Sequence, residues 1–197
     1  MLLTLVKQMR TAIVLLALFT VLTGIVYPCL VTGLAQLLFP WKANGSLIEQ
    51  DGKVIGSKLI GQAFSDPAYF WGRPSETSPY PYNALNSSGS NMGPSNPIFL
   101  ETVKKRVELL RLANLKMLPL VPVDLVTASA SGLDPDISPM AAFYQVERIA
   151  NARKMMPESI RMLIRDTITR RTFGILGESR INVLQLNLAL DTLQNKR

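Results

Sequence analysis

The chain has 197 residues, 48% of them hydrophobic, and its 21 Lys and Arg against 14 Asp and Glu give a formal net charge of +7. It contains no His and a single Cys. These counts exclude a Ser-His-Asp or Cys-His catalytic centre, a His-ligated metal and an internal disulfide. The length suits one domain plus an appendage.

The first feature along the chain is a run without any charged residue, from Thr11 to Phe39. A helix of about 20 apolar residues crosses the hydrocarbon core of a bilayer, so the run predicts a transmembrane helix over residues 11–39. Lys7 and Arg10 precede it, and the positive-inside rule then places residues 1–10 in the cytoplasm and residues 40–197 outside. The alternative is a cleaved signal peptide, but the apolar core of such a peptide is usually only ~7–15 residues long.

Three residues within this run indicate its shape and its packing against other helices. Pro28 removes one backbone donor and is expected to kink the helix. Thr20 and Gly24 form a small-xxx-small pair, which allows a second helix to approach closely. The pair favours a membrane partner over a lone anchor.

The remainder, residues 42–197, carries 19 Lys and Arg against 14 Asp and Glu, hence +5. Its first element is a predicted β-hairpin over residues 46–61, because Asp51-Gly52 suits a type I′ turn between two β-prone arms. No charge cluster in this region predicts nucleic-acid binding. The basic residues of the C-terminal third are typical of a solvated face.

Residues 64–97 are dense in Pro, Ser, Asn and Gly, which disfavours regular structure. However, residues 64–82 hold six of the chain's fourteen aromatic residues, and disordered linkers are poor in aromatics. The loop is therefore expected to be ordered, either over its own domain or by docking on another protein. Its Tyr, Trp and Arg residues are those that interfaces favour. The residues predicted at a partner interface are Tyr69, Phe70, Trp71 and Arg73 in this loop, with Thr20 and Gly24 in the membrane helix.

Three helices follow, each opened by a proline. Asn96-Pro97 predicts a capped helix that ends near Asn114, with Phe99, Val103, Val107 and Leu110 on its inner face. Ser138-Pro139 predicts a second helix to about Lys154, and Pro157 a third to about Arg170. Between the first two, Pro119 and Pro122 confine residues 121–129 to a short extended piece. Residues 180–193 are predicted to be a short strand that enters a final helix.

Two segments were candidates for chemistry. Ser88–Pro97 contains two glycines but lacks the Lys-Ser/Thr of a P-loop and the spacing of a dinucleotide-binding turn, so Gly89 and Gly93 are assigned to turns. Asp134 and Asp136 could hold a cation, yet two carboxylates around a proline more often form an Asx-turn before a helix. The sequence thus predicts no catalytic residue, no metal site and no firmly bound cofactor.

The chain resembles the C subunits of the Kdp potassium-importing P-type ATPases over almost its whole length. The order and spacing of the motifs agree, as does the single N-terminal span. The matching segments are FPWKANGSLI (39–48), GSKLIGQAF (56–64), YFWGRPS (69–75), PYN (81–83), SGSNMGPSNP (88–97), VPVDLVTASASGLDPDISP (121–139) and INVLQLNLALD (181–191).

The resemblance implies a non-catalytic accessory subunit in a bacterial inner membrane, with ATP and potassium handled by the complex. The implied partners are a channel-like potassium-selecting subunit, a P-type ATPase subunit and a small membrane peptide. The subunit is expected to stabilise this assembly and to cap the outer side of the potassium-selecting subunit. The implied fold is a single N-terminal transmembrane helix plus an α/β (α+β) extracytoplasmic domain.

A second role proposed for the family is that of a catalytic chaperone that raises the ATP affinity of the pump subunit. It rests on a likeness between a Ser-Gly-Gly-Ser stretch and the ABC signature. The candidates here are Ser88, Gly89, Ser90 and Asn91, and Ser88 departs from the pattern, since the family often has the first Gly there. The expected topology also opposes this role, because ATP is cytoplasmic and these residues are expected outside.

Overall fold

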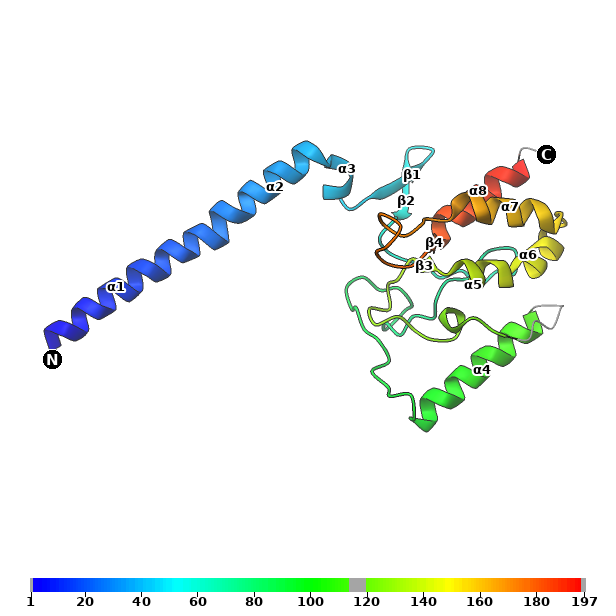
Figure 1. Cartoon of the computed structure of the whole chain (residues 1–197), viewed down its shortest axis with the longest axis horizontal. Coiled ribbons are helices and arrows are strands. Elements are labelled where there is room, and N and C mark those ends of the chain that lie inside the picture. The colour runs from blue at the N-terminus through cyan, green and yellow to red at the C-terminus, as the bar shows by residue number, and fades with distance from the viewer. Residues whose placement is uncertain (1, 114–119, 196–197) are drawn as a thin grey trace. The chain divides into compact units, whose positions relative to one another are not determined.

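The computed structural model describes residues 2–113 and 120–195, and the chain divides into two compact units, Met1–Leu47 and Ile48–Arg197. The N-terminal unit is a long helical rod (Figure 1) that continues into one short helix. Its elements are α1 (Leu2–Val21), a π-helix (Leu22–Val26), α2 (Tyr27–Leu38) and α3 (Pro40–Ala43).

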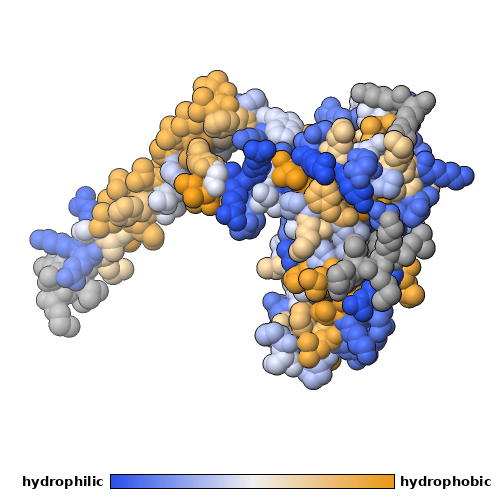
Figure 2. All heavy atoms as spheres, turned by 45° about the vertical axis from the view of Figure 1, so that its right-hand side comes forward, coloured by the Kyte–Doolittle hydropathy of each residue, from blue (hydrophilic) through white to orange (hydrophobic). Residues whose placement is uncertain are grey.

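The rod is able to cross a membrane. The segment Val6–Leu38 has 33 residues, and its most apolar stretch has a mean hydropathy of 2.4 with no part of it buried. Figure 2 shows hydrophobic side chains over the visible face of this helix. Because a helix rises 1.5 Å per residue, the segment exceeds the ~30 Å of a bilayer core and can span it with some tilt.

The helix changes its winding just before Pro28. The backbone N–H of Tyr27 donates to the carbonyl of Leu22, five residues back, and Pro28 then occupies the first turn of α2. Pro28 cannot donate to the carbonyl four residues earlier, and its ring would clash with that carbonyl in a regular α-helix. A π-turn makes room for the ring, and it is the form that the predicted proline distortion takes.

The hairpin is confirmed. Strands β1 (Leu47–Gln50) and β2 (Lys53–Ser57) form a two-stranded sheet. Asp51 and Gly52 join them with φ of 52° and 73°, the pair of positive values that a type I′ turn requires.

The first predicted helix of the C-terminal unit is also confirmed, as α4 (Pro97–Ala113). The Asn96 Oδ1 accepts a hydrogen bond from the Ile98 N–H at 2.9 Å, as expected of an N-cap. Leu110 is buried, and Val103 and Val107 pack against the core. The predicted end at Asn114 lies outside the described residues.

The segment predicted to be extended after α4 is different. A 3₁₀ helix, Val123–Leu125, follows Pro122, and the Leu125 N–H donates to the Pro122 carbonyl at 3.1 Å. Pro122 fixes φ near the helical value, so one short turn forms there at little cost. The turn buries Leu125 and Val126 in the core.

The second predicted helix is two helices, α5 (Pro139–Tyr144) and α6 (Val146–Arg153), separated at Gln145. The Ser138 cap is confirmed, since its Oγ accepts from the Ala141 N–H at 3.0 Å. The third, α7 (Pro157–Thr167), ends three residues before the predicted Arg170, because Ile168 is extended and Thr169 pairs with Arg180.

The strand-then-helix prediction for the C-terminal segment is correct. Strand β4 (Ile181–Asn182) pairs antiparallel with β3 (Asp136–Ile137), and α8 (Val183–Asn195) follows directly. Helices α6, α7 and α8 pack against one another (Figure 1), and their inner faces form the core with the two strands. The fully buried core side chains include Ile137, Ile149, Ile160, Ile164, Ile181, Leu186 and Leu190. The chain is thus one apolar N-terminal helix followed by a mixed helix and small-sheet domain.

Candidate functional site

The loop between β2 and α4 contains no helix or strand over residues 58–96, yet its backbone is firmly held. The holding groups are polar side chains of helices α6 and α8 and of Gln145, the residue between α5 and α6. We call residues 64–82 of this segment the aromatic loop. Its conformation produces the candidate site, and its attachments to the domain determine that conformation.

Two buried amides hold the loop at Phe70 and Trp71. The Asn187 Oδ1 accepts from the Phe70 N–H at 2.8 Å, and the Asn187 Nδ2 donates to the Phe70 carbonyl at 3.1 Å. Gln145 does the same for Trp71, with an N–H···Oε1 bond of 2.8 Å and an Nε2···O bond of 3.1 Å. Each amide offers one donor and one acceptor, as a neighbouring β-strand would, and so satisfies backbone groups that burial removes from water.

Arg148 of α6 holds the same segment from a second side. Its Nη1 donates to the carbonyls of Pro67 and Tyr69 at 2.5 and 3.0 Å, and its Nη2 donates to the Gln145 Oε1 at 2.6 Å. The guanidinium carbon lies 3.9 Å from the centre of the Trp71 ring, a close cation–π stack. Burial lowers the pKa of Arg148 to about 10 and the nearby Asp66 raises it, so the group remains charged at neutral pH.

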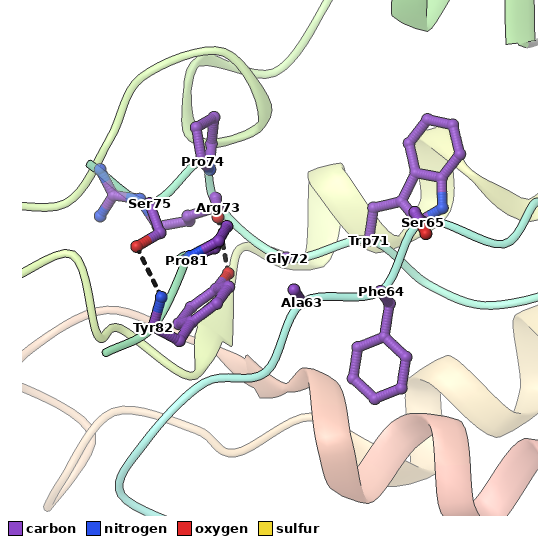
Figure 3. Close-up of a pocket in the computed structure, with 10 residues that line it drawn as sticks. All are labelled: Ala63, Phe64, Ser65, Trp71, Gly72, Arg73, Pro74, Ser75, Pro81 and Tyr82. Carbon is purple, nitrogen blue, oxygen red and sulfur yellow. Dashed lines mark hydrogen bonds between the residues drawn. The ribbon is translucent and has the colours of Figure 1, made fainter. Parts of the chain in front are cut away.

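Arg73 ties the next part of the loop to residues 127–134. Its Nη1 pairs with the Asp134 Oδ2 at 3.0 Å, and its Nη2 donates to the Ala128 carbonyl at 3.1 Å. The Tyr82 hydroxyl donates to the Arg73 carbonyl at 2.6 Å, as Figure 3 shows. Burial, then the charge of Asp134, raises the pKa of Tyr82 to about 12, while Arg73 opposes the rise. Tyr82 is therefore a neutral donor at any physiological pH.

These attachments leave a mostly apolar cleft of 340 Å³ in the aromatic loop. In Figure 3 the rings of Phe64 and Trp71 point in opposite directions, and the Tyr82 hydroxyl points toward the backbone of Arg73. A Cβ on Gly72 would lie 2.7 Å from the Tyr82 hydroxyl oxygen, so glycine allows the backbone to approach that hydroxyl closely. The cleft is lined by Ala63, Phe64, Ser65, Trp71, Gly72, Arg73, Pro74, Ser75, Pro81 and Tyr82.

The structure brings the predicted loop residues together but gives them different positions. Trp71 and Arg73 line the cleft and are partly exposed. Tyr69 lies over Arg153, with its hydroxyl 3.3 Å from the Asp191 Oδ2. Phe70 is 0% exposed within the core of its own domain. The expectation that the loop is ordered over its own domain is therefore confirmed.

Phe70 requires a correction to its assigned position, because a side chain without exposed surface cannot itself contact a partner. It supports the loop from beneath. Docking of another protein on Tyr69, Trp71 and Arg73 stays a prediction, as does docking on Thr20 and Gly24. Gly24 has no atom of the described chain within 4 Å of a built Cβ, so this side of the helix is open.

The Ser88–Asn91 segment lies against residues 130–131. The Ser88 N–H donates to the Ser131 carbonyl at 3.0 Å, and a Cβ on Gly89 would lie 2.8 Å from the Ala130 carbonyl oxygen. Gly89 is not in the predicted turn; it allows a close backbone approach instead. Gly93 is in a turn, since the Asn96 N–H donates to its carbonyl at 3.0 Å, as predicted.

Asp134 makes the predicted Asx-turn, and Asp136 forms an ion pair instead. The Asp134 Oδ1 accepts from the Asp136 N–H at 3.0 Å, and the Asp136 Oδ2 pairs with the Arg180 Nε at 3.0 Å. Burial, then the charge of Asp134, raises the pKa of Asp136, although Arg180 and Asn182 oppose the rise. Among the described residues no three His, Cys, Asp or Glu side chains gather where a metal could bind.

The sequence did not predict that Gln145, Arg148 and Asn187 hold the loop. They lie far along the chain from it, so spacing alone does not connect them. One signal was present, because Gln145 and Asn187 each interrupt an apolar stretch, AAFYQV and LQLNLAL. A buried polar side chain needs a partner, and a loop with unpaired backbone is the natural source of one.

These observations define a protein with one N-terminal helix able to cross a membrane and a domain whose loop presents a partly apolar cleft. The model of the family "K+-transporting ATPase, c chain" matches residues 9–192. The chain is similar to the potassium-transporting ATPase KdpC subunit of Paraburkholderia xenovorans, with 57% identity over 94% of this chain and 96% of that one. It is 56% identical to that of Methylococcus capsulatus, over 96% of this chain and 100% of that one. The chain belongs to this family of potassium-transporting ATPase C subunits, as its motifs predicted.

Proposed function

We propose that the chain is an accessory subunit of an ATP-driven potassium import complex, required for assembly and capping the outer side of the potassium-selecting subunit. The observation that carries the proposal is the exposed apolar span over Val6–Leu38, in a chain that belongs to a family of ATPase subunits. A span with no buried part in its own chain leaves its surface to lipid and to neighbouring helices. The anchor thereby concentrates the domain at the membrane that holds the transport machinery.

The division of labour proposed here is the one that the resemblance to the family implies. ATP hydrolysis is assigned to the P-type ATPase subunit and ion selection to the channel-like subunit, with a small membrane peptide completing the complex. This chain acts by contact and binds no cofactor of its own. Its two contact sites are the small-residue side of the helix at Thr20 and Gly24 and the cleft of the aromatic loop.

The cleft suits such contact because its shape is fixed before any partner arrives. The buried amides and Arg148 hold its backbone, so little conformational entropy is lost when a partner docks. Trp71 and Arg73 are among the residue types that most often dominate interface energetics, and both line the cleft.

A filled cleft tests this assignment without damage to the core. Ser65 is exposed and lines the cleft, so Ser65→Trp adds bulk there and removes no native contact. We expect a severalfold lower yield of the partner subunits in co-purification with the tagged chain. The matched control is Ser95→Trp, at an exposed serine outside the cleft. Equal recovery with both variants would remove the cleft from the interface.

The orientation of the anchor decides between this role and that of an ATP-handling chaperone. In a Cys29→Ser background, Ser95→Cys should react with a membrane-impermeant maleimide in spheroplasts, and Gln8→Cys only after permeabilisation. Both positions are exposed in the structure. Reaction in the opposite order would place Ser88–Asn91 with cytoplasmic ATP and favour the chaperone role.

A further inference from the structure

One turn of the C-terminal unit exposes a group of apolar side chains that neither the fold nor the proposed function uses. We call residues 172–176 the apolar tip. Thr172 and Leu176 form an isolated antiparallel bridge that closes the tip. Phe173 is 88% exposed, Ile175 77% and Leu176 62%. Three large apolar side chains within four residues are a patch that soluble surfaces rarely present without a binding role.

The backbone of the tip is largely satisfied from within. The N–H groups of Thr172 and Leu176 donate to each other's carbonyls at 2.9 and 3.0 Å. Gly174 donates to the Arg171 carbonyl at 3.1 Å and Ile175 to the Thr172 carbonyl at 3.2 Å. Backbone groups without partners are what excludes most loops from a lipid environment, and this tip has few of them.

The tip also holds Phe173 in an unusual conformation. Its φ is +54°, a left-handed value that is unfavourable for a bulky residue and that glycine, as at Gly174 with φ of +77°, adopts freely. Packing within the domain does not repay this cost, because the ring is almost fully exposed. Strain of this kind is often retained where it serves function.

Basic residues flank the tip. Residues 168–180 contain Arg170, Arg171 and Arg180 against one acidic residue, Glu178. Glu178 pairs with Arg171 at 2.6 Å, and Arg180 pairs with Asp136, while Arg170 is exposed to solvent. Exposed apolar side chains can enter the interfacial layer of a bilayer, and arginines beside them are attracted to anionic headgroups.

The tether keeps the domain near such a surface. The span ends at Leu38 and the second unit begins at Ile48. Ten residues extend to at most roughly 35 Å, and a unit of 150 residues has a radius of gyration of roughly 15 Å. The domain therefore cannot leave the neighbourhood of the bilayer, and docking of the tip is an intramolecular event with a high effective concentration.

We infer that the apolar tip docks into the headgroup layer of an anionic bilayer and that Phe173, Ile175 and Leu176 enter its apolar boundary. The contact is a second, reversible attachment of the domain, in addition to the helical anchor. This inference goes beyond the proposed function and depends only on the membrane anchor. Lipid binding by the tip can therefore be disproved without disproving the subunit assignment, and the reverse is also true.

The test uses the full chain with Cys29→Ser and one new cysteine carrying an environment-sensitive NBD label. The tip variant is Ile175→Cys, with Leu176→Cys as a second reporter, and the matched control is Leu112→Cys, 82% exposed on α4. Each is reconstituted in phosphatidylcholine vesicles with or without phosphatidylglycerol. A phosphatidylcholine spin-labelled near the glycerol end of its acyl chain quenches any label that enters the interface.

We expect about threefold stronger quenching at the tip than at Leu112 in anionic vesicles, and a weaker difference without phosphatidylglycerol. Adding Arg170→Glu should reduce quenching at the tip alone. Equal quenching at the tip and at Leu112, or no effect of anionic lipid, overturns the inference. So does a tip label that lipid never quenches and that becomes shielded only when the other subunits are present, a result that assigns the tip to a protein partner.

Discussion

Arg148 shows how one side chain can determine the shape of a loop. Its guanidinium donates hydrogen bonds to the carbonyls of Pro67 and Tyr69 and to the Gln145 side chain. It also stacks on the Trp71 ring. An arginine is suited to this position because its planar fork reaches several acceptors at once and its face stacks on an aromatic ring.

Arg148→Met should therefore destabilise the folded chain by about 3 kcal/mol or more, because buried acceptors lose their donor. The measurement is urea unfolding of the full chain in detergent. The control is Arg165→Met at an exposed position of α7, where a change within about 0.5 kcal/mol is expected. Similar losses in both variants would mean that the guanidinium contributes only as surface charge.

Tyr82 provides a prediction in alkaline solution. Burial raises its folded pKa to about 12 from the ordinary tyrosine value of 10.0, so the protonated form is favoured in the folded state. The stability that comes from Tyr82 is fully present below pH 10 and is lost as the pH rises through about 12. Tyr82→Phe, which lacks the bond to the Arg73 carbonyl, should be about 1 kcal/mol less stable at pH 8. That deficit should shrink by pH 11.5, and a constant deficit across this range would contradict the assignment.

At the scale of elements, α8 both builds the core and positions the loop. Its Leu186 and Leu190 are fully buried, and Asn187 between them bonds both backbone groups of Phe70. The helix therefore couples core packing to loop conformation.

Asn187→Leu keeps the number and branching of the side-chain heavy atoms but leaves the Phe70 N–H and carbonyl unpaired, so we expect a loss of about 2–4 kcal/mol in stability. Asn195→Leu, at the exposed end of the same helix, controls for helix propensity and should be nearly neutral. Thermal unfolding followed by circular dichroism measures both. A neutral Asn187→Leu would show that the loop backbone finds other partners.

The sequence predicted correctly those features that are determined by neighbouring residues, and it missed those that depend on distant parts of the chain. The hairpin turn at Asp51-Gly52 and the caps at Asn96 and Ser138 rest on residues adjacent to the structure that they determine, and they were correct. The break at Gln145 was not predicted, because its reason is the Trp71 backbone, 74 residues away. The predicted interface position of Phe70 was corrected for the same reason, since burial depends on the fold around it.

For the whole molecule, the proposed assembly can be tested in the membrane helix. Gly24→Leu fills the side of the helix that the small-xxx-small pair leaves open, and no described atom lies within 4 Å of a Cβ there. The helix itself should remain intact, while co-purification of the other subunits should fall severalfold because a partner helix can no longer approach. Gly33→Leu is the matched control, since that glycine is equally open within the same span. If both variants recover the complex equally well, helix packing at Gly24 has no part in assembly.

The attachments of the aromatic loop have a consequence for attempts to transplant it. A loop shaped by its own turns can be grafted onto another scaffold as a cassette. This one takes its form from Gln145, Arg148 and Asn187, which lie far downstream in the chain. Residues 64–82 therefore do not determine their own conformation. A peptide of that sequence should not reproduce the surface that these residues form in the intact chain.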